Sequence, residues 1–201
     1  FIIGGQGGVG QGWKMLMDSL AAGRSISLPS LSVAAVELAA RATGAYATVR
    51  EQFNLPIGRF EGIEEPLARI AGHAYLMNAV RVLTCAAVDA GEKPAVLSAV
   101  AKAYLTDGMR TSVIDGMDIM AGAAICSGPR NIMSRIYVSA PIGITVEGAN
   151  ILTRSLITFG QGSIRCHPYV HAEMQAVAAG DLKGFDKAFF GHVGFVYTNA
   201  V

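Results

Sequence analysis

A carboxylate beside a glycine is the feature of this sequence best suited to chemistry. In the segment 145–154, Glu147 is followed by Gly148 within an apolar stretch just ahead of a predicted helix. Apolar surroundings raise the pKa of a glutamate from about 4.3 to roughly 6–7, where it can act as a general base near neutral pH. A solvated glutamate in a surface loop is the alternative, and the segment alone leaves both interpretations open.

The composition limits the classes of protein that this chain can belong to. Of its 201 residues 52% are hydrophobic, 15% are charged and 7% are aromatic, and 24 are glycine. The core is therefore built from small and aliphatic side chains, and we expect further apolar faces to be covered by other subunits or domains. The net charge is +1 without a basic run, which excludes a nucleic-acid-binding surface.

The cysteines and histidines favour neither a disulfide framework nor a metal site. Cys85, Cys126 and Cys166 are dispersed without a CxxC pair, as expected in a reducing compartment, and we predict a cytoplasmic protein. His167 and His171 lie four residues apart, but the spacing fixes no third ligand, so we predict no metal. No apolar run approaches the length of a transmembrane helix, although peripheral association with the inner membrane stays open.

Helical periodicity dominates the chain from Trp13 onwards. We expect a helix to about residue 52 with a break near Gly23 and Pro29, then helices over about 63–90 and 95–122. A shorter helix ends near 138, residues 141–148 form a loop, and further helices cover about 150–160, 170–179 and 182–195. Long helices joined by short turns predict an all-α fold, an antiparallel four-helix bundle with a short helical C-terminal extension.

Several short motifs in a fixed order now point to a family. They are Arg24, Arg50-Glu51-Gln52-Phe53, Phe60-Glu61-Gly62-Ile63, Asp118-Ile119-Met120-Ala121-Gly122, Glu147-Gly148-Ala149-Asn150 and Phe159-Gly160-Gln161-Gly162. Over about residues 1–162 this series resembles the C-terminal helical domain of the acyl-CoA dehydrogenases. Residues 163–201 are similar to the extension of longer bacterial fatty-acid members of the long-chain type.

The resemblance implies an organisation along the chain. Residues 1–12 would be the end of a middle β-domain and the loop into the bundle, 13–162 the helical bundle, and 163–201 the start of a C-terminal extension. The glycine-rich segment 4–12 lacks the strand and the acidic residue of a dinucleotide fingerprint, so we interpret it as a flexible loop. The chain starts without an initiator methionine, and we expect a fragment that by itself holds FAD weakly or not at all and has no turnover.

The chemistry that the resemblance implies is α,β-dehydrogenation in fatty-acid β-oxidation. An α-proton leaves an acyl-CoA thioester, a β-hydride passes to N5 of FAD, and a trans-2-enoyl-CoA forms. Glu147 would be the catalytic base. The alternative position of the base in the family corresponds to Gly23, which cannot take a proton. Arg24 and Gly148 would contact the substrate, with a helix cap or a surface charge as the alternative role for Arg24.

The resemblance also implies cofactor contacts. Arg50, Gln52 and Phe53 would bind the pyrophosphate and adenine end of the FAD of a neighbouring subunit. Gly122, Ala149 and Asn150 would lie against the cofactor as well. Glu61 and Asp118 stand where many members carry glutamine, and Ala149 replaces a common threonine, so we expect the adenine end to be held differently here.

The implied partners are an acyl-CoA substrate, an electron-transfer flavoprotein and further copies of the chain in a homodimer or homotetramer. Two alternatives stay open. One is an acyl-CoA oxidase, which passes electrons to oxygen. The other is a non-catalytic helical module for oligomerisation or docking.

Overall fold

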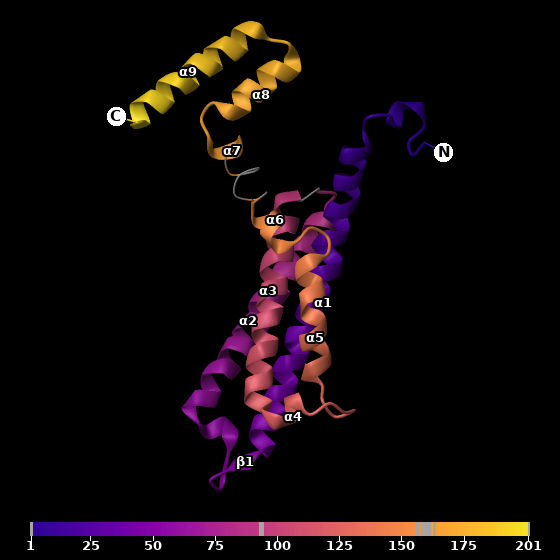
Figure 1. Ribbon diagram of the computed structural model, residues 1–201, viewed down its shortest axis with the longest axis vertical. Helices are drawn as coiled ribbons and strands as arrows, with labels where there is room; N and C mark the ends of the chain where they lie inside the picture. The colour runs from indigo at the N-terminus through magenta and orange to yellow at the C-terminus, as the bar shows by residue number, and fades with distance from the viewer. Residues whose placement is uncertain (1, 93–94, 156, 158–161, 163, 201) are drawn as a thin grey trace. The chain divides into compact units, whose positions relative to one another are not determined.

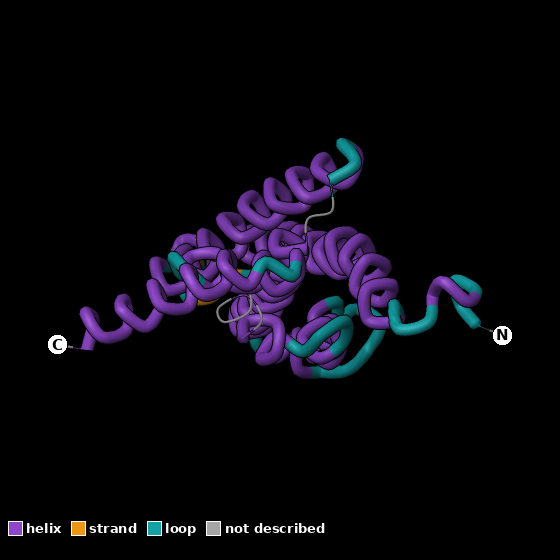
Figure 2. Tube along the Cα trace, turned by 90° about the horizontal axis from the view of Figure 1, so that it is seen from above, coloured by secondary structure: helices purple, strands orange, loops and turns teal. Residues whose placement is uncertain are grey.

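The structure is a computed structural model that describes residues 2–92, 95–155, 157, 162 and 164–200. The chain divides into two compact units, Phe1–Asn150 and Ile151–Val201, and each is described by itself. Nearly all of the described residues are helical, as Figure 2 shows, so the predicted all-α fold class is confirmed.

Four long helices build the first unit (Figure 1). They are α1 (Gly12–Val49), α2 (Glu61–Asp89), α3 (Ala95–Met120) and α5 (Met133–Thr145). Helices α1 and α3 run in one direction and α2 and α5 in the other, with α1 packed along α3 and α2, and α5 packed on α3. The shorter elements of this unit are η1 (Gln6–Gly8), β1 (Glu51–Gln52), β2 (Leu55–Pro56), η2 (Ile57–Arg59) and α4 (Gly122–Ile125).

The core between these helices consists of small, aliphatic and methionine side chains. Its fully buried members include Val36, Ile70, Val113 and Met133. Glycines let the helices approach closely, because a Cβ on Gly116 would lie 3.0 Å from the Met133 sulfur and one on Gly108 would lie 3.0 Å from the Met77 sulfur. Buried hydroxyl groups donate to the carbonyl one turn earlier in the same helix, as Thr43 does to Ala39 at 2.7 Å, so they are satisfied without a partner helix.

Two predicted interruptions are wrong, and both concern proline. Helix α1 is continuous through Gly23 and Pro29, and α5 continues through Pro141 to Thr145 rather than ending near Val138. A proline inside a helix costs roughly 3 kcal/mol, because a backbone hydrogen bond is lost and the ring clashes with the preceding turn. The Pro29 ring is fully buried in the bundle, and packing of this kind offsets that local cost.

The first helix also ends earlier than predicted, because the chain turns into a hairpin. Helix α1 ends at Val49, and β1 pairs antiparallel with β2 across the two residues Phe53 and Asn54. Both have positive φ, 54° and 62°, as a two-residue hairpin turn with the twist of the strands requires. These residues therefore form a rigid projection at the end of the bundle instead of the last turn of a helix.

Polar contacts fix the register of α2 against α3. The Arg69 guanidinium donates to both carboxylate oxygens of Asp115, from Nε at 2.8 Å and from Nη2 at 2.9 Å. One turn further along, the His73 ring lies 2.9 Å from the Ser112 hydroxyl, Nδ1 to Oγ. A two-pronged contact of this kind is directional, so it specifies one axial alignment of the two helices.

The second unit contains the end of α6 (Asn150–Ser155), α7 (Ile164–Cys166), α8 (Val170–Ala179) and α9 (Leu182–Ala200). The helices predicted over 170–179 and 182–195 are confirmed, the latter extending to residue 200. Of the helix predicted over 150–160, α6 covers the first six residues, and most of the remainder lies outside the described residues. His192 and Glu173 join α9 to α8 through a 2.9 Å contact. No helix in the described ranges is long and apolar enough to cross a membrane.

The core assignment predicts different costs for two truncations on α2. Ile70 is fully buried, whereas Leu83 is 59% exposed. We expect Ile70→Ala to lower the free energy of unfolding by about 2–5 kcal/mol, through lost burial and the cavity left behind. Leu83→Ala should change it by less than about 0.5 kcal/mol. Urea unfolding followed by circular dichroism measures both, and equal losses would contradict the assignment of the core.

Candidate functional site

Glu147 lies in a tight turn directly after α5. Its φ is 52° and that of Gly148 is 88°, so two successive residues adopt left-handed backbone conformations. For a residue with a Cβ this costs roughly 1–2 kcal/mol, and such strain persists only where the surroundings enforce it. These backbone angles end α5 and fix the direction in which the Glu147 side chain leaves the backbone.

The Glu147 carboxylate and the Arg24 guanidinium each keep a buried polar atom without a hydrogen bond. These atoms are Oε2 of Glu147 and Nε of Arg24. Buried polar groups are satisfied in the great majority of native structures, so unpaired ones call for a reason. A polar ligand can donate a hydrogen bond to Oε2 of Glu147 and accept one from Nε of Arg24.

Lys102 of α3 lies behind the turn and is the residue that sequence reasoning missed. It has no exposed surface, and its Nζ donates to Asn150 Oδ1 at 2.7 Å, Gly148 O at 2.8 Å and Ile144 O at 3.1 Å. Two of these acceptors are backbone carbonyls, one on each side of Glu147. The turn that carries the acid is thus bound to the centre of the bundle at several points.

Three charged residues of the site influence the pKa of Lys102. Burial lowers the pKa of its amine, and so does the positive charge of Arg24, while Glu147 and Asp107 act to raise it. The predicted site residues Arg24 and Glu147 are therefore close enough to Lys102 for their charges to be felt there. This brings together groups from α1, α3 and the turn after α5.

Asn150 is buried and joins the same network. Its amide nitrogen lies within hydrogen-bonding distance of Ala103 O at 3.2 Å, Thr106 Oγ1 at 3.0 Å and Asp107 Oδ1 at 3.2 Å. The side chain thus points into the bundle, which leaves its backbone and the neighbouring Ala149 for any contact with a cofactor. That contact stays a prediction.

The sequence does contain a signal for Lys102. It is the sole charged residue between Pro94 and Asp107, in a run of small and aliphatic residues. It also shares the helical face of Leu105, Thr106 and Met109, all of which are buried. A lone lysine on the apolar face of a helix predicts a buried amine with specific acceptors.

The residues predicted for the adenine end of FAD lie at the opposite end of the bundle. Arg50, Gln52 and Phe53 belong to the exposed hairpin, and Phe53 is 87% exposed. Gly122 begins α4 after Ala121, whose φ is 48°, and α4 lies at the same end as the hairpin (Figure 1). The 25 residue-to-residue steps from Arg24 to Val49 correspond to about 38 Å of helix, so the two groups of predicted residues are far apart.

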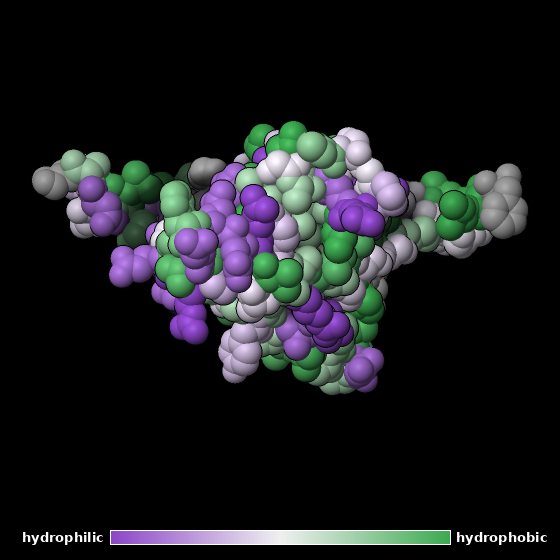
Figure 3. All heavy atoms as spheres, turned by 90° about the horizontal axis from the view of Figure 1, so that it is seen from below, coloured by the Kyte–Doolittle hydropathy of each residue, from purple (hydrophilic) through white to green (hydrophobic). Residues whose placement is uncertain are grey.

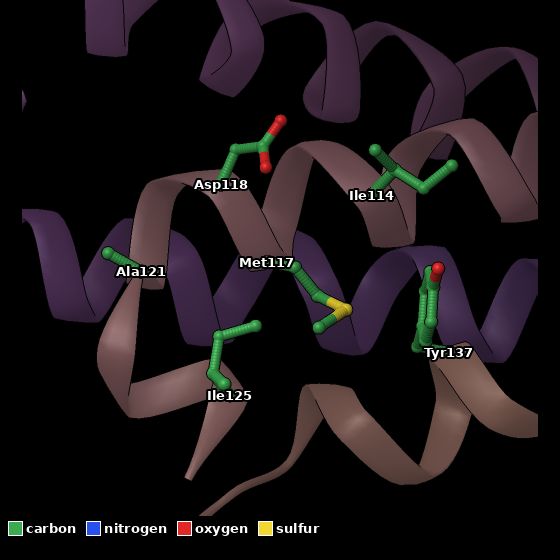
Figure 4. A pocket seen from close by; sticks show the side chains of 6 residues that line it. All are labelled: Ile114, Met117, Asp118, Ala121, Ile125 and Tyr137. Carbon is green, nitrogen blue, oxygen red and sulfur yellow. The ribbon is translucent and has the colours of Figure 1, made fainter.

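A pocket of about 550 Å³ opens beside Ala121, the residue before Gly122 (Figure 4). It is lined by residues of α3, of α5, of the end of α4 and of the position just before α4, namely Ile114, Met117, Asp118, Ala121, Ile125 and Tyr137. Most of its wall is apolar, and Asp118 supplies a carboxylate. A pocket of this size and lining can accept a flat aromatic group such as a nucleobase.

Comparison with known protein families decides the identity of the fold. Residues 10–160 match the family model "Acyl-CoA dehydrogenase, C-terminal domain", and residues 164–201 match "Acyl-CoA dehydrogenase, C-terminal, bacterial type". This chain belongs to the acyl-CoA dehydrogenase family. It represents a C-terminal part of such a protein, as the resemblance in the sequence implied.

Solved structures share the fold at low sequence identity. An acyl-CoA dehydrogenase from Geobacillus kaustophilus matches with a TM-score of 0.71 and 20% identity, covering 76% of this chain and 39% of that one. A glutaryl-coenzyme A dehydrogenase in complex with glutaryl-CoA matches with a TM-score of 0.69 and 23% identity over 78% and 39%. The prolyl acyl carrier protein oxidase AnaB matches with a TM-score of 0.70 and 18% identity over 76% and 40%. At these identities the likeness shows the fold alone.

Among curated proteins, the Protein HemX of Proteus mirabilis is 56% identical over 45 residues, which are 22% of this chain and 26% of that protein. A match of this length describes a segment rather than a shared architecture. The chain spans about two fifths of the solved structures that it matches and about a quarter of this curated relative. The activity of the whole protein is therefore a matter for proposal.

The backbone of the turn predicts a measurable strain. At a φ of 88°, Gly148→Ala places a Cβ in a left-handed conformation, and we expect a loss of about 1–2 kcal/mol in the free energy of unfolding. Gly72 lies inside α2 with open space around its Cβ position. Gly72→Ala should instead leave stability unchanged or raise it by about 0.5–1 kcal/mol. Urea midpoints of the two variants test this, and a neutral Gly148→Ala would show that the turn is unstrained.

Proposed function

We propose that the intact protein containing this chain is an FAD-dependent acyl-CoA dehydrogenase of fatty-acid β-oxidation. It converts a fatty acyl-CoA to a trans-2-enoyl-CoA, and Glu147 removes the α-proton. The observation that carries this proposal is the carboxylate of Glu147, which has a buried oxygen without a partner, in a turn held by Lys102. A general base needs an oxygen that is free to approach the proton it removes.

The residues around Glu147 divide the work of proton removal. Glu147 Oε2 takes the proton, and Gly148, which has no side chain, lets the thioester approach the backbone closely. The unpaired Nε of Arg24 is a donor that can orient the substrate or the acid. Because the backbone of the turn is strained and is held by hydrogen bonds from Lys102, the carboxylate needs little reorganisation when the substrate arrives.

FAD fits the residues at both ends of the bundle, and when bound it supplies the acceptor for the hydride that leaves the β-carbon. At one end the unpaired atoms of Glu147 and Arg24 mark the reacting centre. At the other end the exposed fork of donors on Arg50 suits a pyrophosphate. Gln52 and Phe53 follow it in the hairpin, and α4, which begins at Gly122, lies at the same end of the bundle. The separation of about 38 Å supports contacts to two cofactor molecules, one of them belonging to a neighbouring subunit.

The bundle has the surface of a subunit in an assembly. Large apolar side chains reach the solvent on all of its long helices, among them Leu31, Leu38, Tyr75, Leu76, Leu83, Tyr104 and Val138. Figure 3 shows such hydrophobic residues among hydrophilic ones on the surface. Exposed apolar surface of this extent supports a homodimer or homotetramer. From the family membership alone we propose in addition an electron-transfer flavoprotein as the electron acceptor and a cytoplasmic location.

Replacement of the base tests the reaction. In the intact protein, Glu147→Gln keeps the shape of the side chain and removes its basicity. We expect the dehydrogenation of acyl-CoA, followed as bleaching of the flavin, to slow by at least about 10²–10⁴-fold with the bound flavin retained. Glu64→Gln, an exposed position of α2, is the matched control and should keep full activity.

Two results would redirect the proposal. Unchanged dehydrogenation in Glu147→Gln would exclude Glu147 as the base. Formation of peroxide by the wild-type protein at the rate of dehydrogenation would favour an acyl-CoA oxidase. If the wild-type protein is folded but inactive with acyl-CoAs of all chain lengths, the alternative of a non-catalytic helical module for oligomerisation or docking would be favoured.

The role of Arg50 is testable by flavin content. Arg50→Ala removes a cationic fork from the hairpin, and we expect the ratio of FAD to protein to fall about tenfold at limiting flavin, as for the loss of a charge-assisted hydrogen bond. Arg41→Ala, at an exposed position of α1, should leave the ratio unchanged. Equal retention of flavin by both variants would remove Arg50 from the cofactor site.

A further inference from the structure

A lysine without exposed surface lies at the centre of the candidate site, and no step of the proposed reaction uses it. Lys102 donates three hydrogen bonds from Nζ, to Asn150 Oδ1, Gly148 O and Ile144 O, at 2.7, 2.8 and 3.1 Å. All of these acceptors belong to the short segment 144–150, and they bracket Glu147. We call this segment the base turn.

The acceptors identify the protonation state of Lys102. A neutral amine donates two hydrogen bonds and would turn its lone pair toward the third oxygen, whereas an ammonium ion donates three. Because all of the acceptors are carbonyl or amide oxygens, the geometry requires the charged form. Glu147 and Asp107 oppose the effects of burial and of Arg24, so the site contains the negative charge that an ammonium ion needs.

The backbone is shaped to bring these groups together. Gly143 is buried against α3, where an added Cβ would lie 3.3 Å from Thr106 Cγ2. Thr106 is one helical turn after Lys102, and Gly143 directly precedes Ile144. The close approach of α5 and α3 at this glycine places the carbonyl of Ile144 within reach of the ammonium group.

Glu147 itself contributes little to its own position. Its Oε2 has no hydrogen-bond partner, and its φ of 52° is unfavourable for a residue with a Cβ. The position of the carboxylate is therefore set by the backbone on either side, and that backbone is held by Lys102. We propose that Lys102 is a positioning residue, whose ammonium group locks the base turn so that the Glu147 carboxylate stays in place and free of competing partners.

Removal of the donors from Lys102 tests this proposal, whose kinetic part rests on the proposed function. Lys102→Met in the intact protein keeps an unbranched side chain that is one atom shorter, and it removes the charge and the donors. We expect amide hydrogen exchange in residues 144–150 to accelerate at least about tenfold, because hydrogen bonds from a charged donor are lost. Exchange along α2 should stay unchanged.

Kinetics of the same variant separate positioning from general destabilisation. We expect kcat to fall about 100-fold with little change in KM, as for a misplaced catalytic group. Val113→Ala, at a buried position further along α3, is the matched control, which should lower stability without changing kcat.

Each outcome decides the question. Unchanged exchange in the base turn, or an equal acceleration in the base turn and α2, would show that Lys102 is a structural core residue and overturn the proposal. If Lys102→Met does not fold, Asn150→Ala removes one of the acceptors and must accelerate exchange of 144–150 in the same direction. If the wild-type protein is inactive with acyl-CoAs, the proposed function fails, and the exchange measurement still decides the role of Lys102.

Discussion

The contact on which the candidate site depends is the ammonium group of Lys102 and its three oxygen acceptors. A charge without exposed surface is costly unless it is fully hydrogen-bonded, and here the acceptors come from the end of α5, the turn after it and the start of α6. Because α3 packs against α1, α2 and α5, a group fixed to α3 takes its position from the whole bundle. The geometry of Glu147 is thereby tied to the helix that packs against the other three long helices of the bundle.

Small residues make this arrangement sterically feasible. At the glycines 108, 116 and 143, side chains of neighbouring helices lie so close that an added Cβ would be 3.0, 3.0 and 3.3 Å from the nearest of their atoms. Larger residues at 116 and 143 would separate α3 from α5 and lengthen the path from Lys102 to the base turn. The high content of glycine and alanine therefore relates to the site as well as to packing.

The sequence predicted the fold class, the long helices α2 and α3 and the helices of the second unit, because periodicity of apolar residues is a local signal that tertiary packing reinforces. It failed at Pro29 and Pro141, where local chemistry favours a break and burial overrides it. The resemblance to the family pointed to Glu147, but could not show that its Oε2 is unpaired. Lys102 was missed since its partners lie 42 to 48 residues further along the chain.

The continuity of α1 through Pro29 matters for function. Arg24, in the first half of α1, belongs to the group around Glu147, whereas Arg50 follows the C-terminal end of the helix and belongs to the hairpin. A helix broken at Gly23 and Pro29 would let these regions move independently. A continuous helix transmits position along its length, so the reacting centre and the predicted adenine-binding end are held at a fixed distance of about 38 Å. If each end serves a different cofactor, as proposed, α1 is the element that sets the spacing between two active sites of an assembly.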